Sequence, residues 1–327
     1  MSEVSKHLIQ LDTKVPVIKS SCENINSLLK IGGYPTRVLI GIYGPSGSAK
    51  SILCWQEVFF FLKQSQKNVL YFGTEGGEEM YPQLWFSRWK ERFALKSEDL
   101  QRIYVLSMRD IQKIMELHGY FVWIKRSYSG KLDVLTKGLN LKKYDKKGSF
   151  KGAYLSPIEE FVIDNNIGMI VIDSISNPIC LEFSGGGYLD FPARAGITSK
   201  WLNVLQRIAN RMDVLILTVH HQSVRPGSVP DLSTLKDVPK IKGGEITEYN
   251  LKIVTYLHNS PLSSLEDVST LSELRRMYLV RFFDEAKWAN SVPLMINDTG
   301  IYDVSKDEIN ILRKQAEDAK HRRKLMK

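Results

Sequence analysis

The segment that most constrains this chain is a run of small residues between an apolar stretch and an amphipathic one. Residues 36–43 (TRVLIGIY) have the β-branched character of a buried strand, and the residues from Lys50 onward (KSILCWQEVFFFLKQ) have helical spacing. Between them lies GPSGSAKS, residues 44–51. A strand, a glycine-rich turn and a helix in this order are the context of a Walker A loop, where backbone N–H groups surround a polyphosphate. The alternative is an ordinary glycine turn without a ligand.

The predicted nucleotide-binding residues are the whole loop: Gly44, Pro45, Ser46, Gly47, Ser48, Ala49, Lys50 and Ser51. Lys50 is expected to neutralise the outer phosphates of ATP, and the hydroxyl of Ser51 is expected to hold Mg²⁺. The pattern G-x-x-x-x-G-K-[ST] asks for glycine where this chain has Ala49. Since the extra methyl raises the cost of the required backbone conformation, the sequence predicts binding of Mg-ATP but does not predict a full rate of hydrolysis.

Two carboxylates follow apolar runs of the kind that form buried strands. Residues 68–73 (NVLYFG) lead to Glu75, which is the candidate catalytic base for activating water because ligands bind at the carboxyl ends of strands in an α/β sheet. Residues 168–174 (GMIVIDS) resemble a Walker B strand, which would deliver Asp173 to Mg²⁺. Each acid alone could be an ordinary loop or strand-end residue. Their order after the glycine-rich loop favours a nucleotide site.

A further predicted strand, residues 213–218 (DVLILT), runs into His220, His221 and Gln222. Side chains of adjacent strand residues point to opposite faces, so two neighbouring histidines cannot easily ligate one metal ion. A polar strand end is therefore preferred to a metal site. We expect Gln222 to sense the γ-phosphate.

Bulk composition narrows the class of protein. The chain has 327 residues and 43% hydrophobic residues, which suits one large or two small domains. We find no signal-peptide core and no run near the roughly 18 apolar residues that suggest a bilayer span. No membrane contact and a cytoplasmic or nucleoid-associated location are therefore expected. The three cysteines (Cys22, Cys54 and Cys180) are expected to be reduced thiols, and the net charge of +9 favours a polyanionic partner.

Taken in order, these segments resemble the ATPase core of the archaeal RadA and RadB recombinases, a branch of the RecA superfamily. The resemblance covers nearly all of residues 17–304 and rests on SCENINSLLK, GPSGSAKS, FGTEG, ERFALKSEDL, VIDSIS, FSGGGYLDFPARAG, LTVHHQ, IKGGEITEYN and PLMINDTGIYDV. It implies a mostly parallel twisted α/β sheet with helices on both faces and an antiparallel C-terminal extension. It also implies that Glu75 polarises the attacking water and that Gln222 couples the nucleotide state to DNA.

The resemblance also suggests where DNA would bind. Residues 183–196 and 223–242 occupy the places of the two DNA-binding loops of the family. The candidate nucleic-acid residues in these loops are Arg194, Arg225, Lys236, Lys240 and Lys242. The expected function is ATP-dependent DNA binding in recombinational repair, with a DNA-stimulated ATPase. Single-stranded DNA, a RadA-type recombinase and further copies of the chain are the expected partners.

Several departures keep other functions open. There is no room for the N-terminal helix-hairpin-helix domain of RadA, and the N-terminal linker shows no F-x-x-A polymerisation motif. Such losses are typical of a paralogue that assists a recombinase. One alternative is an adaptor that holds a partner under nucleotide control and hydrolyses ATP slowly. Another is a KaiC-like regulatory ATPase, which would be expected to form rings.

The expected domain organisation is a core over residues 1–304 and a basic helical tail over residues 305–327. The core carries a basic insertion at about residues 119–155, in which residues 132–141 and 149–155 are predicted to form a hairpin across DKKG. This insertion either follows a phosphate backbone or is a solvated surface.

Overall fold

The structure is a computed structural model. It describes residues 16–76, 80–126, 132–138, 155–183, 190–223, 239–259, 273–283, 285–286, 290–305, 307–312, 314–315 and 318. Two candidate nucleic-acid residues, Arg225 and Lys236, lie outside these ranges, as do residues 139–154 of the basic insertion.

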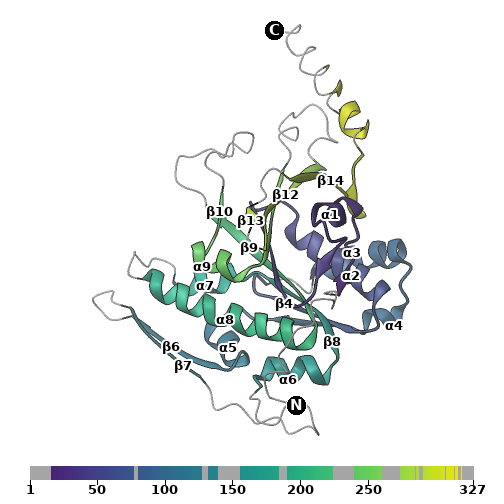
Figure 1. The fold of residues 1–327 in the computed structure, drawn as a ribbon. Coiled ribbons are helices and arrows are strands. Elements are labelled where there is room, and N and C mark those ends of the chain that lie inside the picture. The colour runs from purple at the N-terminus through teal and green to yellow at the C-terminus, as the bar shows by residue number, and fades with distance from the viewer. Residues whose placement is uncertain are drawn as a thin grey trace, which may run out of the picture.

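A twisted sheet of parallel strands forms the centre of the molecule (Figure 1). Its parallel strands run in the spatial order β11-β3-β9-β8-β4-β5. They are β3 (Leu39–Gly44), β4 (Asn68–Gly73), β5 (Ile103–Ser107), β8 (Ile167–Asp173), β9 (Leu215–Ser223) and β11 (Ile253–Asn259). Strands β3 and β8 are buried along their whole length, as expected for parallel strands covered on both faces. Strand β9 lies between these two strands, which end in the phosphate loop and in Asp173.

Antiparallel strands extend the sheet beyond β11. Strands β12 (Leu274–Phe282), β14 (Ser291–Asn297) and β15 (Gly300–Asp303) follow one another at this edge. Short strands add to the periphery: β10 (Lys240–Ile241) pairs with β9, β13 (Glu285–Ala286) pairs with β12, and β1 (Val17–Ile18) pairs with β2 (Tyr34–Pro35). The predicted fold class, a mostly parallel sheet with an antiparallel C-terminal extension, is confirmed.

Helices cover both faces of the sheet, and each face has its own apolar core. One core joins the sheet to α1 (Glu23–Leu28), α2 (Lys50–Gln64) and α3 (Met80–Phe93). The other joins it to α5 (Ile111–Leu117), α6 (Pro157–Asp164), α7 (Ser176–Glu182) and α8 (Phe191–Met212). The short helices α4 (Ser97–Leu100) and α9 (Gly244–Asn250) lie between strands in the chain. In β9, Leu217 belongs to the first core and Ile216 to the second, since neighbouring side chains alternate between faces.

The first predicted DNA loop is shorter than expected, because its second half is helical. Helix α8 begins at Phe191, so that Arg194 lies in its first turns. Proline at the start of this helix has a fixed φ that suits a first turn, which explains why the helix begins before the periodic run at residues 198–211.

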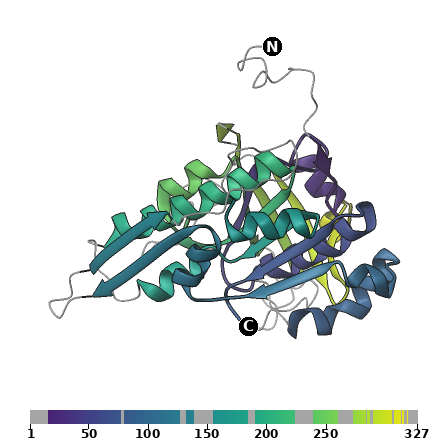
Figure 2. The same cartoon turned by 90° about the horizontal axis from the view of Figure 1, so that it is seen from below.

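The basic insertion begins with an antiparallel strand pair, and the predicted partner of residues 132–141, residues 149–155, lies outside the described residues except for Leu155. Strand β6 (Tyr120–Arg126) pairs with β7 (Leu132–Gly138), from Tyr120 opposite Gly138 to Arg126 opposite Leu132 (Figure 2). The residues between these two strands and the DKKG segment both lie outside the described residues. The first turns of the C-terminal segment are helical, and Ile309 and Leu312 pack against Leu274 and Val304.

Candidate nucleotide-binding site

The phosphate loop connects the end of β3 to the start of α2. Its lysine is turned back onto the loop: Lys50 Nζ donates to the carbonyl oxygens of Gly44 and Pro45, at 3.2 and 2.7 Å, and to Ser48 Oγ at 3.4 Å. Burial lowers the pKa of Lys50. A Cβ added to Gly44 would lie 2.0 Å from the carbonyl oxygen of Leu257, so the loop can leave the sheet only through a glycine.

Ala49 has a left-handed backbone conformation, with φ of 76° and ψ of 23°, at the N-cap of α2. An L-residue with a Cβ occupies this region at a cost of roughly 1 kcal/mol, whereas glycine occupies it freely. The conformation therefore explains why the pattern asks for glycine here. The energetic cost of having alanine at position 49 therefore comes from its backbone conformation at the start of α2.

Asp173 ends β8 in a buried position beside the loop. Its Oδ2 accepts a hydrogen bond of 2.7 Å from the hydroxyl of Tyr71, and its carboxylate is also hydrogen-bonded to the side chain of Ser51. Burial raises the pKa of Asp173. A carboxylate beside a hydroxyl is a pair of oxygen donors of the kind that suits Mg²⁺, which is commonly bound by one or two protein oxygens together with phosphates and water. Ser51 and Asp173 therefore fit the predicted metal role.

Glu75 follows β4 and reaches the same cavity. Its Oε1 accepts a hydrogen bond of 3.1 Å from Ser174 Oγ and lies 2.9 Å from Nε2 of His221. The contact with His221 is the main reason that the pKa of Glu75 is lowered, so the carboxylate is ionised at neutral pH. The cavity has a volume of about 330 Å³ and is lined by Ser46, Gly47, Ala49, Lys50, Ser51, Ile52, Glu75, Asp173, Val219, His221, Arg275 and Ile296.

The expected position of Gln222 requires a correction. Strand β9 continues to Ser223, and its alternation turns His221 toward the phosphate loop and Gln222 toward the opposite face. There the hydroxyl of Tyr256 donates to Gln222 Oε1 at 2.9 Å. The β9 residue that contacts Glu75 is therefore His221, which the sequence suggested only as part of a polar strand end.

Two residues of the cavity wall come from strands that were not predicted to reach the site. Arg275 comes from β12 and Ile296 from β14, the antiparallel strands beyond β11. Because β12 runs antiparallel to β11, its first residues lie at the sheet edge that also carries the phosphate loop. The order of the strands could not be read from residue types. Ile296 lies in the segment PLMINDTGIYDV, which gave no hint of a place in the site, and Arg275 lies in none of the segments that carried the resemblance.

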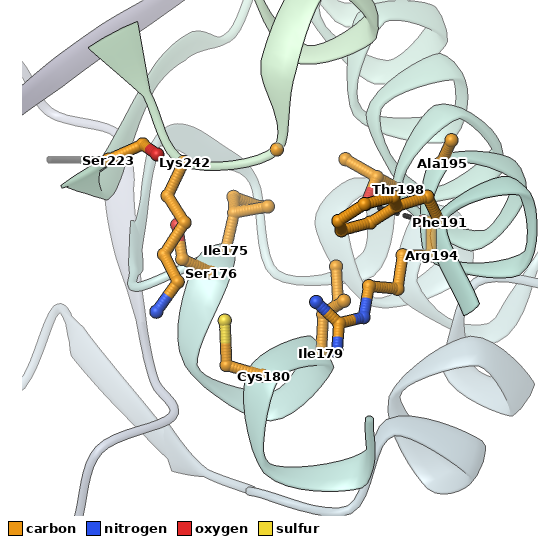
Figure 3. A pocket seen from close by; sticks show the side chains of 11 residues that line it. Ile175, Ser176, Ile179, Cys180, Phe191, Arg194, Ala195, Thr198, Ser223 and Lys242 are labelled. Carbon is orange, nitrogen blue, oxygen red and sulfur yellow. Dashed lines mark hydrogen bonds between the residues drawn. The ribbon is translucent and has the colours of Figure 1, made fainter. Parts of the chain in front are cut away.

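The described candidate nucleic-acid residues lie near a second cavity (Figure 3). Arg194 of α8 and Lys242, just after β10, both line it, whereas Lys240 is exposed and is not part of its lining. The guanidinium of Arg194 donates to the carbonyl oxygen of Phe183. The structure thus places Arg194 and Lys242, which come from two different predicted loops, on the lining of one cavity.

This fold and this site define a P-loop ATPase core of the RecA superfamily. Residues 6–226 match the family model described as an AAA domain, and the chain belongs to this family. The chain is 28% identical over 209 residues to the archaeal flagellar ATP-binding protein FlaH of Sulfolobus acidocaldarius. The aligned residues cover 64% of this chain and 72% of FlaH.

The fold is also similar to that of a solved recombinase. The crystal structure of the RadB recombinase matches with a TM-score of 0.56 and 21% identity, covering 87% of this chain and 98% of that chain. Within the described part of the chain, we find no helix with the length and apolar character needed to cross a membrane.

Proposed function

We propose that this protein is an ATPase whose Mg-ATP cycle controls its binding to DNA. The observation that carries the proposal is the convergence of Lys50, Ser51, Asp173 and Glu75 on one cavity. Lys50 would release the loop carbonyls and donate to the outer phosphates, while Ser51 and Asp173 would hold Mg²⁺. A bound metal ion would supply positive charge that neutralises the phosphate oxygens of the nucleotide.

Glu75 is the proposed base. Its carboxylate is ionised and stands at the mouth of the sheet, where it can accept a proton from an attacking water. The hydrogen bonds from Ser174 and His221 hold it in place, but the lowered pKa also makes it a weaker base than a free carboxylate. Slow hydrolysis is therefore expected, for this reason and because of the backbone conformation of Ala49.

The DNA part of the proposal rests on charge and on position. The net charge of +9 favours a polyanion, and Arg194 and Lys242 gather at the carboxyl ends of β8 and β9. The likeness to the RadB recombinase concerns the fold alone and agrees with this reading. We propose single-stranded DNA as the first ligand to test, with self-association and a RadA-type recombinase as further candidate partners.

A second candidate function is a nucleotide-gated adaptor that hydrolyses ATP slowly and holds a protein partner, in the manner of a KaiC-like regulator. The specific support for it is the similarity to FlaH, whose name describes an archaeal flagellar ATP-binding protein. The tight pairing of Glu75 with His221 agrees with slow turnover.

An ATPase assay of the full chain, with and without single-stranded DNA, separates the two functions. A rate that rises with DNA supports the first function, whereas retained Mg-ATP binding with a slow rate that DNA does not change supports the second. Lys50→Ala is expected to weaken nucleotide binding in both cases, since it removes the charge that faces the phosphates. Equal Mg-ATP affinity of the wild type and this variant would contradict the assigned site.

A further inference from the structure

We propose that the second cavity is a binding site for an amphipathic anion, a ligand with a flat apolar body and a negatively charged group, and that its occupancy is transmitted to Glu75. The cavity has a volume of about 500 Å³ and lies between α7, α8, the end of β9 and the segment that follows β10 (Figure 3). The binding part of the proposal is independent of ATP hydrolysis. The transmission to Glu75 rests on the proposed function.

The floor and one wall of this cavity are apolar. Ile175 and Ile179 are buried at the base of the cavity. Phe191 of α8 lines one wall, and 51% of the surface of this residue is exposed. Figure 3 shows the ring of Phe191 beside Arg194 on the α8 side of the cavity. The guanidinium of Arg194 lies over this ring, 5.6 Å from its centroid, so the ring and the cation together form a wall that suits a planar ligand with a negative charge.

The charges of the cavity have one sign. Arg194 and Lys242 stand on opposite sides, and no carboxylate occurs among the described residues of the lining (Figure 3). Arg194 Nε is buried and has no hydrogen-bond partner in the described structure, although another nitrogen of the same guanidinium donates to Phe183. Since Nε is closed off from the cavity, a bound ligand would be attracted by the charges of Arg194 and Lys242 and would not reach Nε itself. Two cations with no carboxylate among the described lining residues make the cavity better suited to an anion than to a neutral ligand.

A residue of β9 contacts both the cavity and the nucleotide site. The backbone N–H of His221 donates to Ser176 Oγ at 3.3 Å, and its carbonyl oxygen accepts from the backbone N–H of Lys242 at 2.8 Å. Both Ser176 and Lys242 line the cavity, while the ring of the same histidine contacts Glu75. A ligand that moves Ser176 or Lys242 therefore moves the backbone that carries the histidine. We assign His221 as a positioning residue between the two sites.

Binding can be tested with anilinonaphthalene sulfonate, a fluorescent probe that has the proposed chemistry. The probe is titrated into the folded full chain and into Lys242→Glu, with Lys240→Glu as the matched control. The control makes the same change of charge two residues away, on an exposed side chain outside the lining. We expect Lys242→Glu to weaken probe binding by about tenfold or more and Lys240→Glu to leave it nearly unchanged. Equal affinities of the wild type and Lys242→Glu would overturn the site.

A second variant tests the cavity without a change of charge. Ala195 lies on the lining in α8, and Ala195→Trp would fill the space with a large ring. Loss of probe binding in this variant, with an unchanged circular dichroism spectrum, supports the cavity, whereas full binding overturns it. If a single-stranded oligothymidylate displaces the probe, the natural ligand of the cavity is a DNA strand. If the oligonucleotide does not displace the probe, while Lys242→Glu still weakens probe binding, the natural ligand is a small molecule.

Transmission is tested by reciprocity, because two coupled sites change each other's affinity by the same factor. We expect a saturating, non-hydrolysable Mg-ATP analogue to change the dissociation constant of the probe by about fivefold or more in the wild type, and to have little effect in His221→Ala. If calorimetry shows that the analogue binds but the probe affinity stays constant, the transmission is overturned. If the analogue does not bind at all, the proposed function fails instead, while the lysine result still decides whether the cavity is a site.

Discussion

Glu75 and His221 meet across the mouth of the sheet, with Oε1 of the glutamate 2.9 Å from Nε2 of the histidine. They come from different places, one from the turn after β4 and the other from the end of β9. Ser174 adds a third point of contact from the end of β8. The carboxylate is therefore fixed by the ends of β8 and β9, and a shift in either strand would reposition it.

Replacing the carboxylate by its amide separates catalysis from binding. We expect Glu75→Gln to retain Mg-ATP affinity and to lower the rate of hydrolysis by about 100-fold or more, since general bases contribute factors of this size. Calorimetry measures the affinity, and phosphate release measures the rate. Glu98→Gln, on an exposed position of α4, is the control and should change neither. Loss of binding together with hydrolysis in Glu75→Gln would mean that Glu75 supports the fold of the site.

The left-handed conformation of Ala49 predicts a gain from glycine. Ala49→Gly should raise the rate of hydrolysis, because glycine restores the backbone freedom of the phosphate loop, and should change the free energy of unfolding by no more than about 1 kcal/mol. Ala94→Gly is a matched control, since Ala94 also has a positive φ, of 53°, but lies after α3 and away from the cavity. It should change stability to a similar extent and leave the rate unaltered. An unchanged rate in Ala49→Gly would show that the loop has adapted to alanine.

The core strands and the phosphate loop could be predicted because their signals are local. An unbroken apolar run before GPSGSAKS leaves few alternatives to a buried strand, and the runs before Glu75 and Asp173 gave strands of nearly the predicted lengths. Lys50, Ser51, Glu75 and Asp173 were predicted as one site because parallel strands end at one edge of a sheet.

The remaining features depend on register and on strand order. The choice between His221 and Gln222 reverses if a strand is shifted by one residue, and the sequence did not show that β9 continues through both. The pairing of β7 with β6 could not be foreseen either, since the only turn signal used in the insertion was DKKG. Arg275 joined the site only because β12 pairs with β11 in the antiparallel sense.

Stability should depend on pH through a buried acid on the phosphate-loop helix. Glu57 is 3% exposed and accepts hydrogen bonds from Ser20 Oγ, Ser21 Oγ and the Ser21 backbone N–H, at 2.7, 2.9 and 3.1 Å. Burial outweighs these bonds and raises the pKa of Glu57 to about 7. Between about pH 4.5 and 7 the folded chain therefore keeps a proton that the unfolded chain has lost. This contribution to stability is complete at low pH and is lost as the pH rises through 7.

Glu57→Gln isolates this contribution from those of other groups. The difference in the free energy of unfolding between this variant and the wild type should shift in favour of the variant by about 1 kcal/mol per pH unit between about pH 5 and 7. Urea denaturation at a series of pH values measures it. For the exposed Glu98→Gln, the corresponding difference should be nearly flat with pH. A flat difference for Glu57→Gln as well would mean that the carboxylate has the same pKa in the folded and unfolded chains.

The last prediction concerns the antiparallel wall of the nucleotide site. Arg275 lines the cavity that contains Lys50 and Asp173, and burial lowers the pKa of its guanidinium, which nevertheless stays charged because arginine does not deprotonate in proteins. A cation in this position should contact the bound nucleotide, so we expect Arg275→Ala to weaken Mg-ATP binding by about tenfold. Calorimetry with the full chain measures the change.

The neighbouring arginine supplies the control. Arg276 follows Arg275 in β12, faces the other side of the sheet and donates to Ser291 Oγ at 2.9 Å. Arg276→Ala should therefore keep the wild-type affinity for Mg-ATP. If both variants lose affinity equally, the effect comes from a weakened β12 and not from a contact with the nucleotide. If Arg275→Ala loses affinity for ATP but not for AMP, the guanidinium faces the outer phosphates, because AMP lacks them.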